Sequence, residues 1–389
     1  MALAFEQLTN TKIALFYDPA YVGTGGTLGD EGSEVKASLE DLGHSVKTFA
    51  GTDIESWANA LEGVRVLHIP MLRAEPTLSE GAKLILKLFV SQGGTVVFHS
   101  TYQDYGDQKG ADLINKVFKT QLDEIVNTTS SSATSATSGT TFAGITPLPD
   151  NDGTDAIAKG SLPSFAEALF TNASGDATVA GFQYGLGQVI YLGWDWYNSL
   201  PAPGVQNSAW QNVLQASTSL TDGNPNGVTI HGTSKNDSVS KKFDSTDFDD
   251  IFYGGKGNDK AFMRGGSDVL LGEKGKDKLY GEAGDDFISG GKDKDKLWGG
   301  DGGDYFLFDV KVNKKKADKI FDYDEDEDMM VLYASYFPKL SLGEMTSSDF
   351  GKYIDYGSNG VLKYDGKKFA KLQSGSLDID QTDFVIIDA

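Results

Sequence analysis

Short apolar runs alternate with helical stretches over the first half of the chain. The apolar runs cover 12–18, 44–50, 65–72 and 95–100, and helical stretches over 31–43 and 79–94 lie between them. Strands that alternate with helices of this length predict βαβ units and a parallel sheet. A hairpin over 181–199 and a further helix around 211–215 are also expected, whereas the serine- and threonine-rich segment 127–141 predicts a loop.

The hydrophobic pattern changes to a period of nine between 245 and 307. The sixth position of each nonapeptide is aspartate: Asp250, Asp259, Asp268, Asp277, Asp286, Asp295 and Asp304. The eighth position is always apolar: Phe252, Ala261, Leu270, Leu279, Ile288, Leu297 and Phe306. A degenerate copy containing Asp237 precedes them. Matches at two positions in one frame indicate an internal repeat rather than a glycine-rich loop.

A nonapeptide of this kind predicts a specific geometry. Three residues around the eighth position form a short strand whose middle side chain points inward, and six residues form the turn to the next strand. Two repeats complete one coil, and successive coils stack at about 4.8 Å. Glycines suit turn positions with positive φ and places where carbonyl oxygens crowd around one ion. A hard cation such as Ca²⁺ takes roughly 6 to 8 oxygen ligands, of which one turn supplies about half.

These segments match the pattern G-G-x-G-x-D-x-U-x, so the region resembles the nonapeptide repeats of the RTX family. The resemblance implies a parallel β-roll that holds several Ca²⁺ ions, each between turns 18 residues apart. It implies metal ligands at Gly254, Gly255, Gly257, Asp259, Gly266, Asp268, Gly272, Gly275, Asp277, Gly281, Gly284, Asp286, Gly290, Gly291, Asp295, Gly299, Gly300, Gly302 and Asp304. Without Ca²⁺ the segment is expected to be disordered, because its aspartates repel and few apolar residues are buried.

Five residues depart from this pattern. Met263 and Arg264 replace the first two glycines of one turn, Glu273 and Glu282 replace second glycines, and Asp293 replaces a fourth. Carbonyl ligands survive such changes, but a side chain in the left-handed region costs about 1–2 kcal/mol, less for aspartate. These sites are therefore expected to be weaker or slightly reshaped.

Residues one coil apart should also form columns on the outer faces of the roll. One face is expected to carry a lysine column and an aromatic column, and the other an apolar column. The three columns are Lys260, Lys278 and Lys296, then Phe262, Tyr280 and Trp298, and then Ile251, Val269, Phe287 and Tyr305. Such columns indicate either docking against a neighbouring domain or a binding face for an acidic cell-surface polysaccharide or a protein.

Composition narrows the possible partners. The formal charge of −22 disfavours nucleic acid and anionic membranes and favours multivalent cations such as calcium. The absence of cysteine excludes disulfides, thiolate metal sites and cysteine nucleophiles. The first residues lack the pattern of a secretory signal peptide, and no run of about 18 apolar residues predicts a transmembrane helix. A soluble protein exported by another route is expected.

The last residues suggest that route. Asp383, followed by the apolar residues 384–387, resembles the carboxyl-terminal signals of RTX proteins that type I secretion systems of Gram-negative bacteria export. By itself the segment fits a closing β-strand equally well. Together with the repeats it favours a secreted protein, extracellular or on the bacterial surface, with the type I secretion apparatus as a partner.

The layout of 12–220, with 89–100 before a turn and 184–196 near its end, resembles the class I glutamine amidotransferase-like and ThuA-like flavodoxin-type folds. The resemblance implies a parallel α/β/α sandwich, without the thiolate glutaminase activity that needs a cysteine. His68, His99 and Asp195 are candidates for a catalytic or metal site at the carboxyl edge of the sheet, where open α/β sheets bind ligands. The alternative is that these are ordinary strand-end residues without a catalytic role.

We therefore expect an α/β domain over 1–222, a calcium-binding β-roll over 227–310, and a β-rich cap with the secretion signal over 311–389. The expected function is that of a secreted calcium-binding protein, a non-catalytic surface, matrix or adhesion component that folds when it meets calcium. The alternative is an extracellular hydrolase of carbohydrate or a related substrate, active through the first domain, with the roll as folding and export module. The lack of a clear catalytic constellation favours the first.

Overall fold

A computed structural model describes residues 12–22, 31–61, 64–91, 93–100, 109–126, 130–138, 140–148, 155–184, 187–193, 208–218, 229–239, 245–247, 249–312, 316–373 and 377–387. The chain divides into two compact units. The first contains the elements from β1 to α5, and the second contains those from β11 to β27.

The first unit is built on a mixed sheet. Its described strands follow the order β2-β1-β3-β4-β10-β9-β7-β5, with β8 paired to β9 and β6 to β8. They are β1 (Lys12–Phe16), β2 (Ser45–Phe49), β3 (Val66–Ile69), β4 (Thr95–His99), β5 (Glu124–Val126), β6 (Ser132–Ala133), β7 (Asp155–Ile157), β8 (Glu167–Thr171), β9 (Ala177–Tyr184) and β10 (Gly187–Leu192). The parallel part, β2-β1-β3-β4-β10, has the 2-1-3-4-5 order of doubly wound flavodoxin-like sheets.

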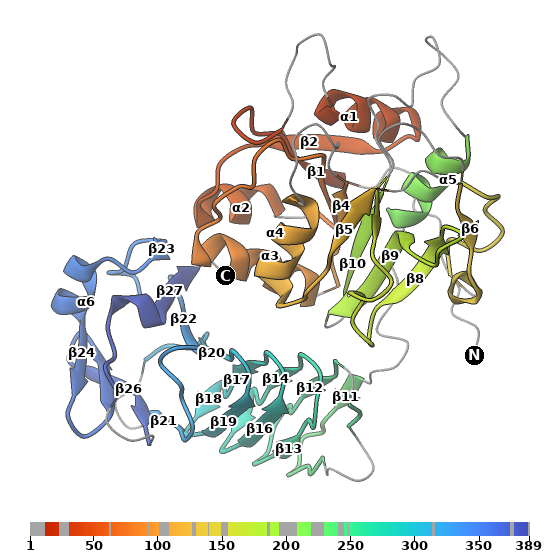
Figure 1. Cartoon of the computed structure of the whole chain (residues 1–389). Coiled ribbons are helices and arrows are strands. Elements are labelled where there is room, and N and C mark those ends of the chain that lie inside the picture. Colours follow the sequence, from red (N-terminus) through yellow and green to blue (C-terminus); the bar gives the residue numbers. More distant parts are fainter. Residues whose placement is uncertain are drawn as a thin grey trace. The chain divides into compact units, whose positions relative to one another are not determined.

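Helices cover both faces of this sheet (Figure 1). They are α1 (Glu31–Asp41), α2 (Ile54–Leu61), α3 (Glu80–Ser91), α4 (Lys109–Phe118) and α5 (Ser208–Ser217), with a 3-10 turn η2 (Ser135–Thr137). Val35 of α1 and Trp210 of α5 join one core with Ile13 of β1. On the opposite face, the ring of Trp57 in α2 lies 5.6 Å from that of Phe16. The expected α/β architecture is confirmed.

In its described part, the expected hairpin over 181–199 is formed by β9 and β10, which pair antiparallel. The strands from β5 to β8 enlarge the sheet with further antiparallel pairs that the apolar pattern does not reveal. The predicted loop 127–141 is wrong in part, because β6 pairs with β8. Thr134 follows β6, and its Oγ1 donates to the carbonyl oxygen of Ala168 at 2.7 Å. Side-chain and backbone hydrogen bonds thus fix a segment whose composition is typical of loops.

The described residues of the second unit form two long sheets and a two-stranded pair, β15-β18. One sheet has the order β11-β12-β14-β17-β20-β22-β27-β23 and the other β13-β16-β19-β21-β26-β25-β24. The strands from β11 to β19 are β11 (Thr229–His231), β12 (Ile251–Tyr253), β13 (Lys260–Phe262), β14 (Val269–Leu271), β15 (Lys274–Gly275), β16 (Lys278–Ala283), β17 (Phe287–Ser289), β18 (Lys292–Asp293) and β19 (Lys296–Asp301). The rest are β20 (Tyr305–Phe308), β21 (Asp318–Ile320), β22 (Met329–Tyr333), β23 (Gly343–Glu344), β24 (Ile354–Gly357), β25 (Val361–Tyr364), β26 (Lys367–Leu372) and β27 (Phe384–Ile387), with α6 (Ser347–Tyr353) and η3 (Gln381–Asp383).

The nonapeptides build a parallel β-roll with the expected coil. Ile251 pairs with Val269 on the eight-stranded sheet, and Lys278 pairs with Lys296 on the seven-stranded sheet. Both pairs are 18 residues apart, so successive repeats alternate between the two sheets. All seven eighth-position side chains are buried in one core between the sheets.

Both sheets continue past the nonapeptides. Lys296 pairs with Lys319, and Tyr305 pairs with Met329, so the parallel stacking persists while the intervening turns lengthen. The terminal apolar residues form β27, which is buried and runs parallel to β22. The segment is therefore a β-strand in the folded protein. Among the described residues, no helix is long and apolar enough to cross a membrane.

Candidate metal sites

The repeat turns form two rows, one where the chain leaves each long sheet. The first row contains the turns 254–259, 272–277 and 290–295, which lead from the eight-stranded to the seven-stranded sheet. The second row contains 263–268, 281–286 and 299–304, which lead back. Each turn ends in a sixth-position aspartate, so the expected ligands lie in rows with a spacing of one coil.

Hydrogen bonds link the aspartates of each row into a ladder. The main-chain N–H of Asp259 donates to Oδ1 of Asp277, and that of Asp277 donates to Oδ1 of Asp295, both at 2.7 Å. The second row repeats the bond from Asp268 to Asp286 at 2.8 Å. One carboxylate oxygen of each aspartate is therefore used in coil stacking.

The other carboxylate oxygen has no partner in the six complete repeats. The Oδ2 atoms concerned are buried and belong to Asp259, Asp268, Asp277, Asp286, Asp295 and Asp304. Leaving a buried oxygen of a carboxylate without a partner is costly unless a proton or a cation occupies it. These six atoms are the strongest indication in the structure of positions that hold a cation.

Burial makes the negative form of these carboxylates unfavourable. Desolvation, with smaller contributions from neighbouring carboxylates, raises the pKa of Asp277 to about 7, of Asp304 to about 8 and of Asp295 to about 9. The same cause raises the pKa of Asp268 and Asp286 well above the usual range. At neutral pH these carboxyl groups therefore favour the protonated form. A divalent cation bound beside them would stabilise the charged form instead.

Carbonyl oxygens lie beside the unpaired carboxylate oxygens. A Cβ added to Gly254 would lie 2.9 Å from Asp259 Oδ2 and 2.7 Å from the carbonyl oxygen of Gly272, one coil later. Gly272 has the same surroundings, 2.7 Å from Asp277 Oδ2 and 2.9 Å from the oxygen of Gly290. The missing side chain of the first glycine thus leaves a space lined by hard oxygens from two turns, which suits Ca²⁺.

Four of the five predicted departures adopt the positive φ of the glycines they replace. At the second position, φ is 78° for Arg264, 63° for Glu273 and 88° for Glu282, compared with 85° for Gly255. At the fourth position, φ is 97° for Asp293. Each of these four non-glycine residues therefore carries the strain expected of the left-handed region.

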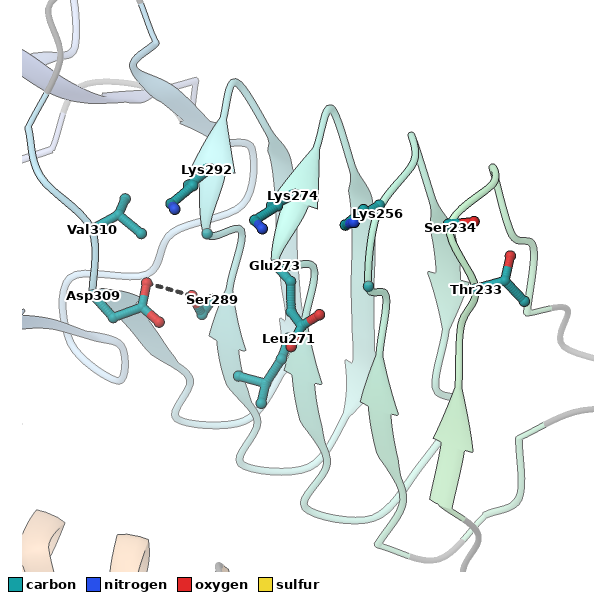
Figure 2. Close-up of a pocket in the computed structure, with 12 residues that line it drawn as sticks. Thr233, Ser234, Lys256, Leu271, Glu273, Lys274, Ser289, Lys292, Asp309 and Val310 are labelled. Carbon is teal, nitrogen blue, oxygen red and sulfur yellow. Dashed lines mark hydrogen bonds between the residues drawn. The ribbon is translucent and has the colours of Figure 1, made fainter.

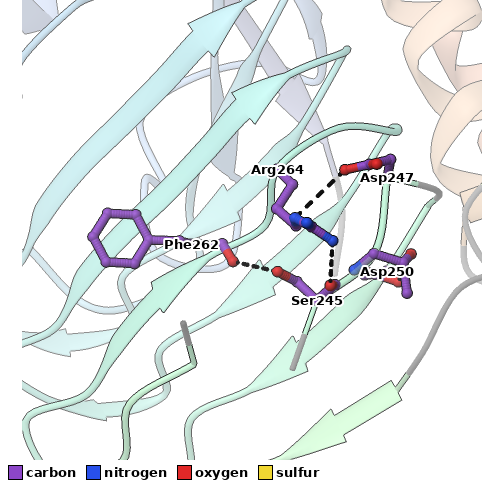
Figure 3. Close-up of polar contacts among 6 residues, drawn as sticks. Ser245, Asp247, Asp250, Phe262 and Arg264 are labelled. Atoms are coloured by element: carbon purple, nitrogen blue, oxygen red, sulfur yellow. Dashed lines mark hydrogen bonds and ion pairs between the residues drawn. The ribbon is translucent and has the colours of Figure 1, made fainter. Parts of the chain in front are cut away.

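Arg264 also anchors its turn (Figure 3). Its guanidinium donates to the carbonyl oxygen of Ser245 at 3.0 Å and forms an ion pair with Asp247 at 3.4 Å. The hydroxyl of Ser245 in turn donates to the carbonyl oxygen of Phe262 at 2.8 Å. These contacts tie the turn to the preceding coil and offset part of the backbone strain.

Three aspartates at the ends of the rows differ from the inner six. Both oxygens of each are hydrogen-bonded within the protein, because the residue four positions earlier donates its main-chain N–H. Thr233 donates to Asp237 at 2.6 Å, Thr246 to Asp250 at 2.7 Å and Asp324 to Asp328 at 2.9 Å. None of the three donors has positive φ. The second position of the turn therefore distinguishes two kinds of turn. Where its φ is not positive, its N–H donates to the sixth-position aspartate, and where its φ is positive, one oxygen of that aspartate has no partner.

Sequence reasoning missed two aspartates that extend the ladders. The N–H of Asp295 donates to Asp318 Oδ1 at 2.9 Å, and that of Asp304 donates to Asp328 Oδ1 at 2.8 Å. Burial raises the pKa of each to about 7. The signal was the tripeptide Asp-Lys-Ile at 318–320, which repeats Asp-Lys-Leu at 295–297 after a longer turn.

The first unit brings together two of its three candidates. His68 Nδ1 and His99 Nε2 lie 3.0 Å apart, and both side chains are buried. Burial lowers the pKa of His99 to about 3 and that of His68 well below its usual range, so neither is charged at neutral pH. Asp195 lies outside the described residues. No group of three or more histidine, aspartate or glutamate side chains suited to a metal occurs in the described part of the chain.

A calcium site in the roll does not require a cluster of three acidic side chains if main-chain carbonyl groups supply most of its ligands. One carboxylate from each turn plus main-chain oxygens provides hard ligands without any cluster of three acidic side chains. Such sites need the precise stacking of coils that the ladder provides.

Three solved structures are similar to parts of this chain. A mannosidase from an Opitutaceae bacterium, strain TAV5, is 14% identical with a TM-score of 0.36, covering 55% of this chain and 36% of its own. A putative ThuA-like protein from Bacteroides uniformis is 9% identical with a TM-score of 0.35, covering 55% of this chain and 92% of its own. The AlgE6R3 subunit of the Azotobacter vinelandii mannuronan C5-epimerase is 22% identical with a TM-score of 0.27, covering 40% of this chain and 80% of its own.

This chain spans about a third of the length of that mannosidase. No curated protein matches it. The family described as RTX calcium-binding nonapeptide repeat matches residues 244–279, 264–297 and 271–306. The repeats whose turns carry the unpaired aspartate oxygens are therefore RTX calcium-binding nonapeptide repeats.

Proposed function

We propose that this is a secreted calcium-binding protein whose β-roll folds when it meets extracellular Ca²⁺, and that it works as a surface, matrix or adhesion component. The observation that carries the proposal is the set of six buried Oδ2 atoms without a partner. The ligands would be these carboxylates and the carbonyl oxygens of the turn glycines. Bound calcium would replace the repulsion between stacked carboxylates with attraction, so that binding and folding occur together.

The test is a calcium titration of the full chain after removal of divalent ions. Far-ultraviolet circular dichroism should show a gain of β-structure, and calorimetry should show several ions bound. Magnesium should not replace calcium, because it requires a tighter octahedral site and dehydrates reluctantly. The absence of any transition up to about 10 mM calcium would refute the proposal, because that concentration is well above the dissociation constants of weak extracellular calcium sites.

We propose three domains, with boundaries at 222 and 227 and at 310 and 311. Export would use the type I apparatus of a Gram-negative bacterium, with Asp383 and β27 as part of its signal. In the folded protein, Asp383 Oδ1 accepts a hydrogen bond from the Tyr323 hydroxyl at 2.9 Å. The same residues would thus serve export in the unfolded chain and packing in the folded one.

Export and folding can be separated by two variants. Truncation after Asp380 should abolish export by a type I transporter. Leu362→Asp, which places a charge at a fully buried position, should disrupt the fold and leave export intact. If both variants are exported equally, the terminal segment is not a signal.

The seven-stranded sheet offers a surface for the adhesive role. Its aromatic column extends one residue further than expected, with ring centroids 4.4 Å apart from Phe262 to Tyr280, then 4.2 Å to Trp298 and 4.2 Å to Phe321. The ammonium group of Lys260 lies 4.3 Å from the ring of Phe262. The side chains of this column are partly exposed, so it presents a flat apolar stripe to a polysaccharide or a protein partner.

The hydrolase alternative lacks a comparable observation. His68 and His99 are buried, uncharged and in contact with each other, which does not supply a carboxylate pair or an activated nucleophile. A loss of turnover in His99→Ala with retained secondary structure would nonetheless favour it.

A further inference from the structure

A groove follows the first row of turns along the outside of the roll. It has a volume of about 550 Å³ and is lined by residues from five successive coils, from Thr233 to Asp309. Five coils at about 4.8 Å per step give a length of about 19 Å. A groove of this shape accommodates an extended chain that lies along the axis of the roll.

Three lysines stand in one line along this groove. Lys256 pairs with Lys274, and Lys274 pairs with Lys292, so the three occupy one column in direct register. Figure 2 shows the three lysines on successive coils along one edge of the roll. All three are exposed, and no ion pair joins any of them to an acidic residue in the described part of the chain. Like charges directly opposite each other destabilise a sheet, and a bound anionic chain would reverse that effect.

The rest of the lining suits a sugar polymer better than a nucleic acid. Hydroxyl groups come from Thr233, Ser234 and Ser289, and carboxylates come from Glu273 and Asp309. Asp309 already accepts a hydrogen bond from the Ser289 hydroxyl at 2.9 Å (Figure 2). Carboxylates accept hydrogen bonds from hydroxyl groups, which a polysaccharide carries on every sugar, and none of the residues that line the groove has an aromatic ring on which a base could stack.

We propose that this groove binds a linear acidic polysaccharide, with Lys256, Lys274 and Lys292 on the acidic groups of the polymer and Glu273 on its hydroxyls. The inference rests on the proposed function, because the groove exists only when calcium has stacked the coils. It adds a site distinct from the aromatic column and specifies the chemistry of the partner.

The test measures binding of a short oligouronate to the calcium-loaded full chain at a fixed free calcium concentration. The triple variant K256Q/K274Q/K292Q should weaken binding about tenfold, because it removes three exposed charge pairs that each contribute a factor of about two. The control K352Q/K367Q/K368Q removes the same charge at exposed positions outside the groove and should change affinity less than about twofold. The methyl-esterified oligomer should bind about as weakly as the triple variant does.

Glu273→Gln separates sugar recognition from simple charge attraction. It removes a negative charge, so a purely electrostatic site would bind the oligouronate more tightly. A site that uses the carboxylate as an acceptor for hydroxyl groups would bind it more weakly, which is the expected result.

Several outcomes would overturn the proposal. They are equal losses in the two triple variants, equal binding of the esterified oligomer, tighter binding by Glu273→Gln, or equally tight binding of single-stranded DNA. Circular dichroism on the same samples keeps the calcium proposal separate. A normal calcium transition without oligouronate binding refutes the groove alone, and binding without a calcium transition refutes calcium-dependent folding.

Discussion

The main-chain N–H of Asp250 donates to Oδ1 of Asp268 at 2.6 Å, yet the two carboxylates have different surroundings. Asp250 accepts hydrogen bonds from the N–H and the hydroxyl of Thr246, at 2.7 and 2.9 Å. Oδ2 of Asp268 has no partner. Neighbouring aspartates in one ladder are thus either satisfied by the protein itself or left for a cation.

This difference predicts opposite results for one substitution at two sites. Asp268→Asn should lower calcium affinity by at least about tenfold and reduce the number of bound ions, because it removes a charged oxygen ligand. Asp250→Asn should leave the ion count unchanged, because an amide oxygen can still accept the bond from Thr246. Calorimetric titration of both variants provides the measurement. Equal losses would mean that the hydrogen bonds from Thr246 do not exempt that turn from metal binding.

In the absence of calcium, acidification should promote folding of the roll. The folded-state pKa values of Asp277, Asp304 and Asp295 are raised to about 7, 8 and 9, above the ordinary value of 3.8. A raised pKa means that the folded state binds protons more tightly, so stability is greatest below about pH 4 and is lost as the pH rises towards 9. Circular dichroism of the chelator-treated chain between pH 5 and 9 should therefore show more β-structure at the acidic end. The opposite trend would indicate that these carboxylates are solvated in the apo state.

Calcium should reverse this dependence. Bound cations favour the charged form of the ligands, so protons and calcium compete and the midpoint of the calcium titration should shift to higher concentration as the pH falls. A calcium midpoint that does not change with pH would contradict this competition.

The backbone of the second turn position offers a stability test. Glu282 has φ of 88°, so Glu282→Gly should relieve about 1 kcal/mol of strain and raise the urea midpoint of the calcium-loaded roll. Asp293→Gly should gain less, because aspartate tolerates positive φ and its ion pair with Lys316 at 2.6 Å would be lost. A larger gain at 293 than at 282 would show that backbone strain does not determine the difference.

The coil of the roll could be predicted from sequence because it is a local property. A period of nine with aspartate and apolar positions in one frame sets which residues stack, and the pairing of Ile251 with Val269 agrees. The positive φ at Arg264 and Glu273 follows from the same register. Asp318 and Asp328 escaped prediction because their turns have irregular lengths, so only the stacked fold reveals that they continue the ladders.

The fold of the first unit was harder to predict from the sequence. The four strands from β1 to β4 and their helices have clear periods, whereas β6 and β8 pair through residues whose composition is typical of loops. The contact between His68 and His99 depends on β3 and β4 being neighbours with matched register. Sequence placed both at strand ends, but neither their contact nor their uncharged state can be derived without the burial that tertiary packing creates.

The two rows of turns differ in charge, and calcium should distinguish them. Apart from the sixth-position aspartates, the turns of the first row carry five lysines and two acidic residues, whereas those of the second carry one arginine and three acidic residues. A nearby unit charge changes the energy of a divalent ion by about 0.5 kcal/mol at the surface, or about twofold in affinity. The second row should therefore bind calcium more tightly, and the titration should show two classes of sites that converge at high salt.

Paired variants assign the two classes. Lys276→Gln with Lys294→Gln removes exposed positive charge from the first row and should strengthen the weaker class alone. Asp285→Asn with Asp301→Asn should weaken the tighter class alone, to a similar extent of about fourfold for two charges. If either pair of variants shifts the affinities of both classes together, the two rows are coupled through the shared core. A single class, insensitive to either pair, would mean that carbonyl geometry outweighs the surrounding charge in setting the affinity of the roll.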